Sequence, residues 1–129
     1  MEDTLYKEEL LEHYRHPRNY GTLADPTVVT ESLNPSCGDQ IAIQAIFEGG
    51  SVVCVKFTGK GCVISQAAAS MLTEKIMGTS LEQLEALNKN DMLNLVGISL
   101  GPTRLRCALL SLEAAQQAVA QYRDTHKSE

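Results

Sequence analysis

Apolar residues recur at helical spacing near both ends of the chain and alternate with polar residues in between. A helix is predicted over 4–15, with Thr4 as its N-cap, and the pair His16 and Pro17 ends it. Residues 27–33 are rich in Val and Thr, and residues 41–48 alternate in the manner of a half-buried strand. A Gly-Gly turn at 49–50 leads into a third predicted strand over 52–58.

The second half of the chain is predicted to be helical. An alanine-rich helix over 64–77 ends at Gly78, and two short helices follow at about 80–87 and 90–97. The segment SLEQ at 80–83 has the form of a capped helix start. A loop is expected at 100–103, and a last helix over 107–122 has its apolar residues on one face. Strands that precede a run of helices are typical of an α+β fold. We therefore expect a single domain over 1–129, a three-stranded antiparallel sheet with helices packed on one face.

Composition and charge limit the kinds of molecule that this chain can bind. The 129 residues carry 16 acidic and 11 basic side chains, for a net charge of −5, with four Tyr, two Phe and no Trp. Nucleic acids and anionic lipids need clustered cations, and base stacking needs aromatic rings, so we expect no nucleic-acid partner and no membrane partner. No apolar run is long enough to span a bilayer, and the acidic N-terminus does not resemble a secretory signal. These features predict a cytoplasmic protein whose cysteines stay reduced.

Three of the four cysteines lie at predicted element ends, in turns marked by Gly or Pro. Cys37 precedes Gly38, Cys62 follows Gly61 and opens a helix, and Cys107 is expected to open the last helix. A helix N-terminus stabilises a thiolate through its N–H groups and its dipole, and the thiolate is both the nucleophile and the metal ligand. These three cysteines are therefore candidates for sulfur or metal chemistry.

Asp39 completes the candidate site. It lies two residues from Cys37, so in an extended stretch both side chains leave on the same face. Three sulfurs and one oxygen, from Cys37, Asp39, Cys62 and Cys107, suit tetrahedral zinc, or iron in an iron–sulfur cluster. The spacing contains no C-x₂-C pair, so burial of the cysteines as small apolar side chains stays open at this point.

The charged neighbours and the fourth cysteine have other expected roles. Lys60 and Arg106 each lie close to a candidate cysteine in sequence, and a nearby cation favours a thiolate. We expect these two residues beside the ligands rather than among them. Cys54 lies inside the predicted strand over 52–58, where packing against the sheet is the better interpretation.

Four segments of the sequence together resemble one known family. They are HPRNYG at 16–21, NPSCGD at 34–39, GCVISQA at 61–67 and RC at 106–107. In this order and at this spacing they resemble the iron–sulfur cluster assembly scaffold family of the IscU/NifU N-terminal type, over about residues 5–122. The combination is more specific than any one of the segments.

The resemblance implies an IscU/SufE-like fold and a role in cluster assembly. Members of the family accept sulfur from a cysteine desulfurase, build a [2Fe–2S] or sometimes a [4Fe–4S] cluster on three cysteines, and pass it to apo-proteins. Carried over, Cys37, Cys62 and Cys107 resemble the cluster ligands, and Asp39 resembles the aspartate that makes the cluster labile. The same resemblance makes Cys107 the expected persulfide acceptor and Lys60 a residue that steadies a thiolate.

Two positions depart from the housekeeping branch of the family. That branch has His immediately before the third cysteine, whereas this chain has Arg106, which does not bind metals. Arg at this position resembles the SufU branch, whose members bind zinc with three cysteines and an aspartate and relay persulfide. The segment that SufU proteins usually insert before the third cysteine is missing here. The chaperone-binding segment Leu-Pro-Pro-Val-Lys aligns with LGPTR at 100–104, so recognition by the dedicated Hsp70-type chaperone is not carried over.

Two functions follow as hypotheses. The first is a scaffold and sulfur acceptor that holds a transient [2Fe–2S] cluster on three cysteines and Asp39. The second is a SufU-type zinc-dependent sulfurtransferase, an enzyme in which Zn²⁺ at the same site positions and activates Cys107. A structural zinc domain that only binds partners is a third alternative. It predicts that removing Asp39 or Cys107 abolishes stability and activity together.

Overall fold

Eight elements follow one another in the computed structural model, which describes residues 2–35 and 38–126. They are α1 (Glu2–Arg15), β1 (Val28–Asn34), β2 (Asp39–Glu48), β3 (Ser51–Lys60), α2 (Val63–Ile76), α3 (Leu81–Ala86), α4 (Lys89–Val96) and α5 (Pro102–His126). The predicted order of helices and strands is confirmed, and most bounds differ from the prediction by one or two residues. None of the helices in this part of the chain is both long enough and apolar enough to cross a membrane.

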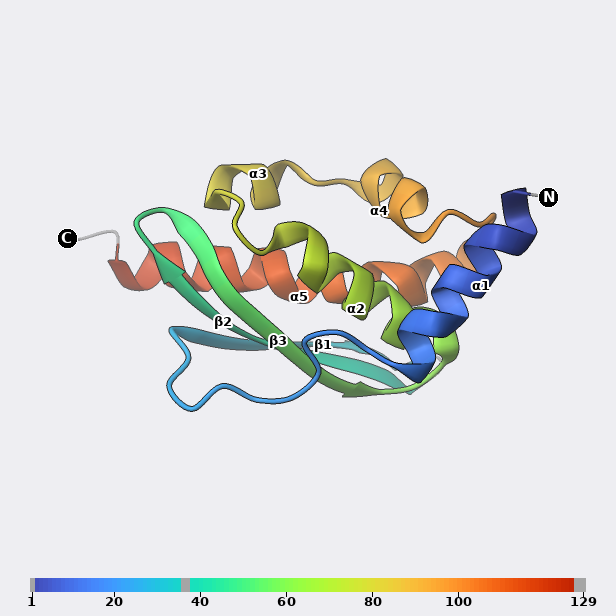
Figure 1. Ribbon diagram of the computed structural model, residues 1–129. Coiled ribbons are helices and arrows are strands. Elements are labelled where there is room, and N and C mark those ends of the chain that lie inside the picture. Colours follow the sequence, from blue (N-terminus) through green and yellow to red (C-terminus); the bar gives the residue numbers. More distant parts are fainter. Residues whose placement is uncertain (1, 36–37, 127–129) are drawn as a thin grey trace.

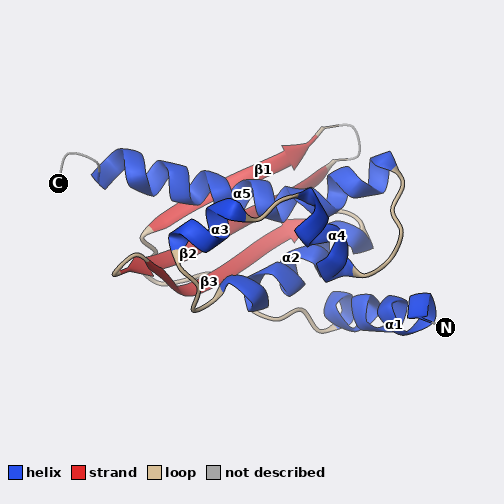
Figure 2. Ribbon diagram, turned by 90° about the horizontal axis from the view of Figure 1, so that it is seen from above, coloured by secondary structure: helices blue, strands red, loops and turns tan. Residues whose placement is uncertain are grey.

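The three strands form an antiparallel sheet in the order β1-β2-β3, as the sequence pattern predicts. The side chains that β2 turns inward are buried, as shown by Ile41, Ile43 and Ala45. Helices α2 and α5 cover this inner face (Figures 1 and 2). The outer face is more open, because Val29 and Leu33 of β1 are 49% and 59% exposed. The prediction of helices on one face of the sheet is therefore confirmed.

The remaining helices build outward from α2 and α5. Helices α3 and α4 lie over these two helices on the side away from the sheet, and α1 packs along α2 (Figure 1). The predicted capped start of α3 is confirmed by reciprocal hydrogen bonds between Ser80 and Gln83. Asn88 and Asp91 cap α4 in the same way.

The start of α5 corrects the sequence prediction. The expected loop at 100–103 and helix start at Cys107 are wrong, because α5 already begins at Pro102. Proline is well suited to the first helical position, where its missing N–H would have no helical acceptor and its fixed φ matches the helix. Cys107 therefore lies in the second turn of α5 and is not the first residue of the helix. The argument that a helix N-terminus activates its thiolate does not apply to it.

A histidine near the end of α1 is buried. His13 lies in the last turn of the helix and is only 6% exposed. Its Nδ1 lies 2.8 Å from the buried hydroxyl of Ser70 on α2, and that hydroxyl also accepts a hydrogen bond from the backbone N–H of Arg18. This group of bonds ties α1 and the segment after it to α2.

The environment of His13 makes the stability of the fold depend on pH. Burial, followed by the nearby Arg18, lowers the pKa of His13 below 6.5 and outweighs the opposite effect of Glu74, Glu9 and Glu12. The folded state thus favours the neutral imidazole. We expect this contribution to be complete above about pH 6.5 and to be lost as the pH falls through the lower folded pKa, by at most about 1.4 kcal/mol per pH unit.

Urea unfolding of the wild type and of His13→Asn between about pH 7.5 and 5 measures this contribution. Asparagine can still reach the Ser70 hydroxyl but does not titrate in this range. The free energy of unfolding should fall more steeply in the wild type than in the variant as the pH decreases. Equal slopes for the two proteins would mean that His13 does not carry the effect.

Candidate metal centre

Asp39 is placed by the hairpin that joins β1 to β2. It pairs with Asn34 at the closed end of the hairpin, and Gly38 with a φ of 75° completes the turn. Asp39 has the same strand parity as Ile41, so its side chain faces the helices and is only 2% exposed. Cys37, expected beside it on an extended stretch, lies outside the described residues. The chain turns at Gly38 and is not extended there.

Cys62 is the N-cap residue of α2, as the sequence predicts. Its backbone is extended, with φ −74° and ψ 168°. The backbone N–H of Cys62 donates to Asp39 Oδ1 at 3.0 Å, and the thiol donates to Oδ2 of the same carboxylate at 3.3 Å. One carboxylate oxygen is thus held by the backbone, while the other faces the sulfur. The Ser65 hydroxyl donates to the carbonyl of Cys62 at 3.1 Å and helps to fix this first turn.

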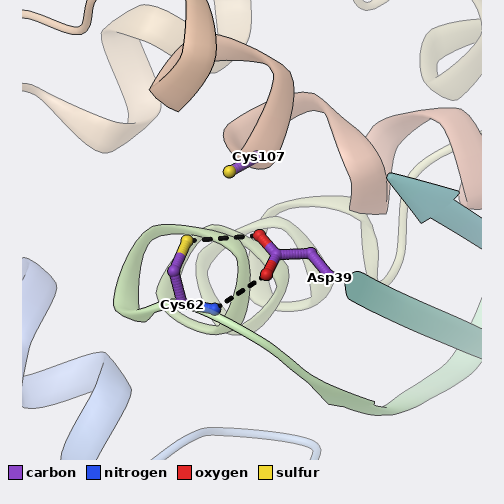
Figure 3. Close-up of side chains that lie close together, drawn as sticks. All are labelled: Asp39, Cys62 and Cys107. Carbon is purple, nitrogen blue, oxygen red and sulfur yellow. Dashed lines mark hydrogen bonds between the residues drawn. The ribbon is translucent and has the colours of Figure 1, made fainter. Parts of the chain in front are cut away.

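Cys107 brings the third ligand from α5. Its side chain is 2% exposed and lies above the pair formed by Asp39 and Cys62 (Figure 3). The ligand atoms of these three residues all lie within 4.8 Å of one another. The fold therefore brings together three of the four residues in the predicted site, each from a different element.

The donor set fits a transition-metal ion. Ligand atoms at about 2.3 Å from a tetrahedral zinc or iron ion are separated from one another by roughly 3.7 Å, so a contraction of about 1 Å or less at the widest pair is enough. Two thiolates and a carboxylate combine soft ligands with one harder ligand, which suits zinc and iron and disfavours magnesium or calcium. The group can bind a metal, and it leaves at least one coordination position for a further ligand.

The remaining predicted site residues lie elsewhere. Lys60 is exposed at the end of β3, opposite Gln40, and has the strand parity of the outer face. Arg106 is exposed on α5 next to Cys107. The structure does not bring Lys60 together with the three ligands. That Lys60 and Arg106 favour the thiolate form of the neighbouring cysteines stays a prediction. Cys54 is half-buried on the outer face, opposite Ile46, and does not belong to the ligand group.

Sequence reasoning missed the role of Gly61. The Cβ of any other residue at this position would overlap the carboxylate of Asp39, and the φ of 136° is one that L-residues rarely adopt. The glycine thus lets the chain pass close enough for the Cys62 N–H to bond the carboxylate. The signal in the sequence is a glycine directly before the N-cap cysteine, but the neighbour that requires it comes from a distant strand.

We expect Gly61→Ala to weaken zinc binding by about tenfold or more, because the displaced carboxylate loses its place beside the sulfur. Gly78→Ala is the matched control, since Gly78 also has a positive φ, of 87°, but has open space around it. Both variants should lose stability in urea unfolding. Only Gly61→Ala should lose zinc affinity in competition with a chelator, and equal affinities in the two variants would refute this role of Gly61.

Fold and site together define a class: small α+β proteins in which cysteine and aspartate side chains from the end of the central strand and from two helices lie close enough to hold a metal ion. The sequence profile of the NifU-like N terminal domain matches residues 5–129. The chain belongs to this family, which confirms the resemblance found in the sequence.

Individual relatives agree with this assignment. The chain is 38% identical to the zinc-dependent sulfurtransferase SufU of Bacillus subtilis, over 92% of this chain and 91% of the relative. It is 32% identical to the iron–sulfur cluster assembly scaffold protein IscU of Haemophilus influenzae, over 92% and 95%. The crystal structure of the N-terminal part of a NifU-like protein from Brucella abortus superimposes with a TM-score of 0.78 at 22% identity, covering 95% of this chain and 96% of that one, which confirms the fold.

The two alignments differ in length. The SufU alignment runs over 135 positions, more than the 129 residues of this chain, so that relative carries residues that this chain lacks. The IscU alignment runs over 122 positions for the same 92% of the chain. In length, the chain therefore matches the IscU relative more closely.

Proposed function

We propose that this protein is a scaffold for the assembly of iron–sulfur clusters. It accepts sulfur from a cysteine desulfurase, holds a [2Fe–2S] cluster as its cargo on three cysteines and an aspartate, and passes the cluster to apo-proteins. The observation that carries the proposal is the convergence of Asp39, Cys62 and Cys107 within 4.8 Å. The family membership and the IscU-like length support the same function.

Each ligand has a role that its surroundings support. Cys62 and Cys107 supply thiolates, the ligands that hold iron–sulfur clusters in proteins. Asp39 supplies the oxygen Oδ2, because its other oxygen accepts the Cys62 N–H. Carboxylate oxygen is a harder ligand and binds the iron of a cluster more weakly than thiolate. A site with one such ligand favours release over permanent retention, which is what a carrier requires. Cys37 is the proposed third cysteine ligand.

A zinc-dependent sulfurtransferase is the second candidate. Arg106 and the 38% identity to SufU of B. subtilis favour it. Cys37, Asp39, Cys62 and Cys107 would hold the zinc, which would keep the sulfurs deprotonated at neutral pH. In this alternative, as the resemblance implies, Cys107 accepts the persulfide.

Anaerobic reconstitution separates the two candidates. The apo-protein is incubated with ferrous iron, cysteine and a cysteine desulfurase, and the visible spectrum, iron, acid-labile sulfide and zinc are measured on one sample. The proposal expects about two iron and two sulfide per protein under these conditions. One zinc per chain that iron does not displace, together with faster desulfurase turnover, would overturn it in favour of the sulfurtransferase.

A further inference from the structure

Two polar side-chain atoms of the interior have no hydrogen-bond partner in the part of the chain that the structure describes. They are Nε2 of Gln66 and the hydroxyl oxygen of Ser111, and both atoms are shielded from solvent. Ser111 as a whole is only 1% exposed. A buried donor without a partner lowers the stability of a fold, so native proteins contain few of them and each calls for a physical explanation.

Both atoms belong to residues that lie one helical turn after a cysteine of the metal-binding group. Gln66 follows Cys62 by four residues at the start of α2, and its backbone N–H donates to the Cys62 carbonyl at 3.3 Å. Ser111 follows Cys107 by four residues on α5. Residues four apart share a helix face, and helical side chains lean toward the N-terminus of their helix. Each unpaired donor therefore leans toward the cysteine that precedes it.

Packing within the chain does not account for the Ser111 hydroxyl. Serine inside a helix usually donates to a carbonyl of the preceding turn, as Ser65 of α2 does to Cys62 at 3.1 Å. Ser111 makes no such bond to a described residue. Alanine occupies other buried positions of α5, such as Ala108 and Ala114, and alanine at position 111 would avoid the cost of an unpaired hydroxyl.

The sulfur atoms of Cys62 and Cys107 become strong acceptors once they bind a metal. A cysteine bound to a metal is deprotonated, so its sulfur carries negative charge. A donor beside such a sulfur stabilises this charge and fixes the orientation of the ligand, and removing it weakens metal binding by about ten- to a hundredfold. Cys107 is only 2% exposed, so a donor to its sulfur has to come from the protein rather than from solvent.

We propose that Gln66 and Ser111 are positioning residues of the metal centre, whose unpaired donors bind the sulfur atoms of Cys62 and Cys107 when a metal is held there. Gln66 Nε2 donates to Cys62 Sγ, and the Ser111 hydroxyl donates to Cys107 Sγ. The inference rests on the metal-holding part of the proposed function, and it applies equally to a cluster and to zinc. Metal binding then satisfies two donors that destabilise the metal-free chain, which links the stability of the fold to the metal.

The test removes each donor and compares it with a partnered donor of the same chemical type. Gln66→Met keeps the length of the side chain but loses the amide, and Ser111→Ala removes one oxygen atom. The control for the first is Gln116→Met, because Gln116 Nε2 donates to carbonyls at the end of α3 at 2.8–3.3 Å. The control for the second is Ser70→Ala, because the Ser70 hydroxyl lies 2.8 Å from the ring of His13. The proposed metal ligands are unchanged in all four variants.

We expect zinc affinity, measured by chelator competition, to fall by about tenfold or more in Gln66→Met and Ser111→Ala. In the Co²⁺-loaded forms of these two variants, the sulfur-to-cobalt charge-transfer band should move to longer wavelength, because a sulfur without its hydrogen bond gives electron density to the metal more easily. Metal-free Ser111→Ala should resist urea at least as well as the wild type, whereas both controls should be less stable and bind metal like the wild type.

The position of the charge-transfer band decides the outcome, because a purely structural role of the two residues would not move it. A band that stays in place in either test variant, or that moves equally in its control, would overturn the proposal while the wild type still binds Co²⁺. A wild type that binds neither zinc nor Co²⁺ would refute the metal-binding group itself, and with it the proposed function.

Discussion

We expect Cys107→Ala to lower the affinity of the chain for zinc by about a hundredfold and to prevent stable cluster assembly, while the chain stays folded. A zinc-binding free energy of roughly 10–16 kcal/mol, shared among four ligands, assigns about 3 kcal/mol to each, which is about two powers of ten in affinity. Cys107 is one of the three ligands that the fold brings within 4.8 Å. Removing the Cys107 thiol therefore removes one bond to the metal.

The fold should tolerate this change because Cys107 is surrounded by well-packed apolar side chains. Cys107 is part of a continuous apolar cluster with side chains of α2, α5 and the sheet. Removing one buried sulfur atom should cost about 1 kcal/mol in the free energy of unfolding. Cys54→Ala is the matched control, because it removes the same atom on the outer face of the sheet and should leave zinc binding unchanged.

Chelator competition and urea unfolding of both variants separate the hypotheses. A structural zinc domain would lose zinc binding and fold together in Cys107→Ala, and the metal-free wild type would unfold as well. Loss of metal binding in Cys54→Ala would show that the ligand group has been assigned wrongly.

The second large effect is expected at Asp39. Asp39→Ala should slow the release of an assembled cluster by about tenfold or more, so that a cluster resistant to oxygen accumulates. Without the carboxylate the cluster loses its weakest ligand, and with it the position at which an acceptor protein most readily displaces the scaffold. The measurement is the decay of the cluster absorbance in air and after addition of an apo-protein.

Asp39→Asn is the control that separates ligation from structure. In Asp39→Ala the N–H of Cys62 loses its acceptor inside the protein, which costs about 1–3 kcal/mol in stability. Asparagine can still accept this hydrogen bond with its amide oxygen, but it carries no charge and is a poorer metal ligand. Both variants should release the cluster slowly, and only Asp39→Ala should be clearly less stable. Clusters in the variants that decay as fast as that of the wild type would disprove the role of Asp39 in release.

The fold could be predicted from the sequence largely because its signals are local. The alternation over 41–48, the Gly-Gly turn and the Ser80 cap each lie within a few residues of the structure that they specify. Local signals can also be ambiguous, and the predicted start of α5 at Cys107 is wrong for this reason. Pro102 reads equally well as part of a loop and as a first helical residue, and only packing decides between them.

The site was predicted less completely because its geometry depends on distant contacts. The sequence spacing indicates candidate ligands, and the family resemblance assigns them to one shared site. Neither indicates that Asp39 accepts a hydrogen bond from the N–H of Cys62. The need for Gly61 follows from that contact and has no local cause. The burial of His13 against Ser70 likewise arises from the packing of α1 on α2, which local periodicity does not specify.

Transfer of a cluster from this protein to an apo-ferredoxin tests the central claim most directly. The protein is reconstituted under anaerobic conditions, freed of unbound iron and sulfide, and mixed with the apo-ferredoxin in the presence of a chelator for free iron. The account predicts that the ferredoxin spectrum appears as the scaffold spectrum disappears, in equal amounts and despite the chelator. A cluster that remains on the protein, or is lost to the chelator while the ferredoxin stays empty, would contradict it.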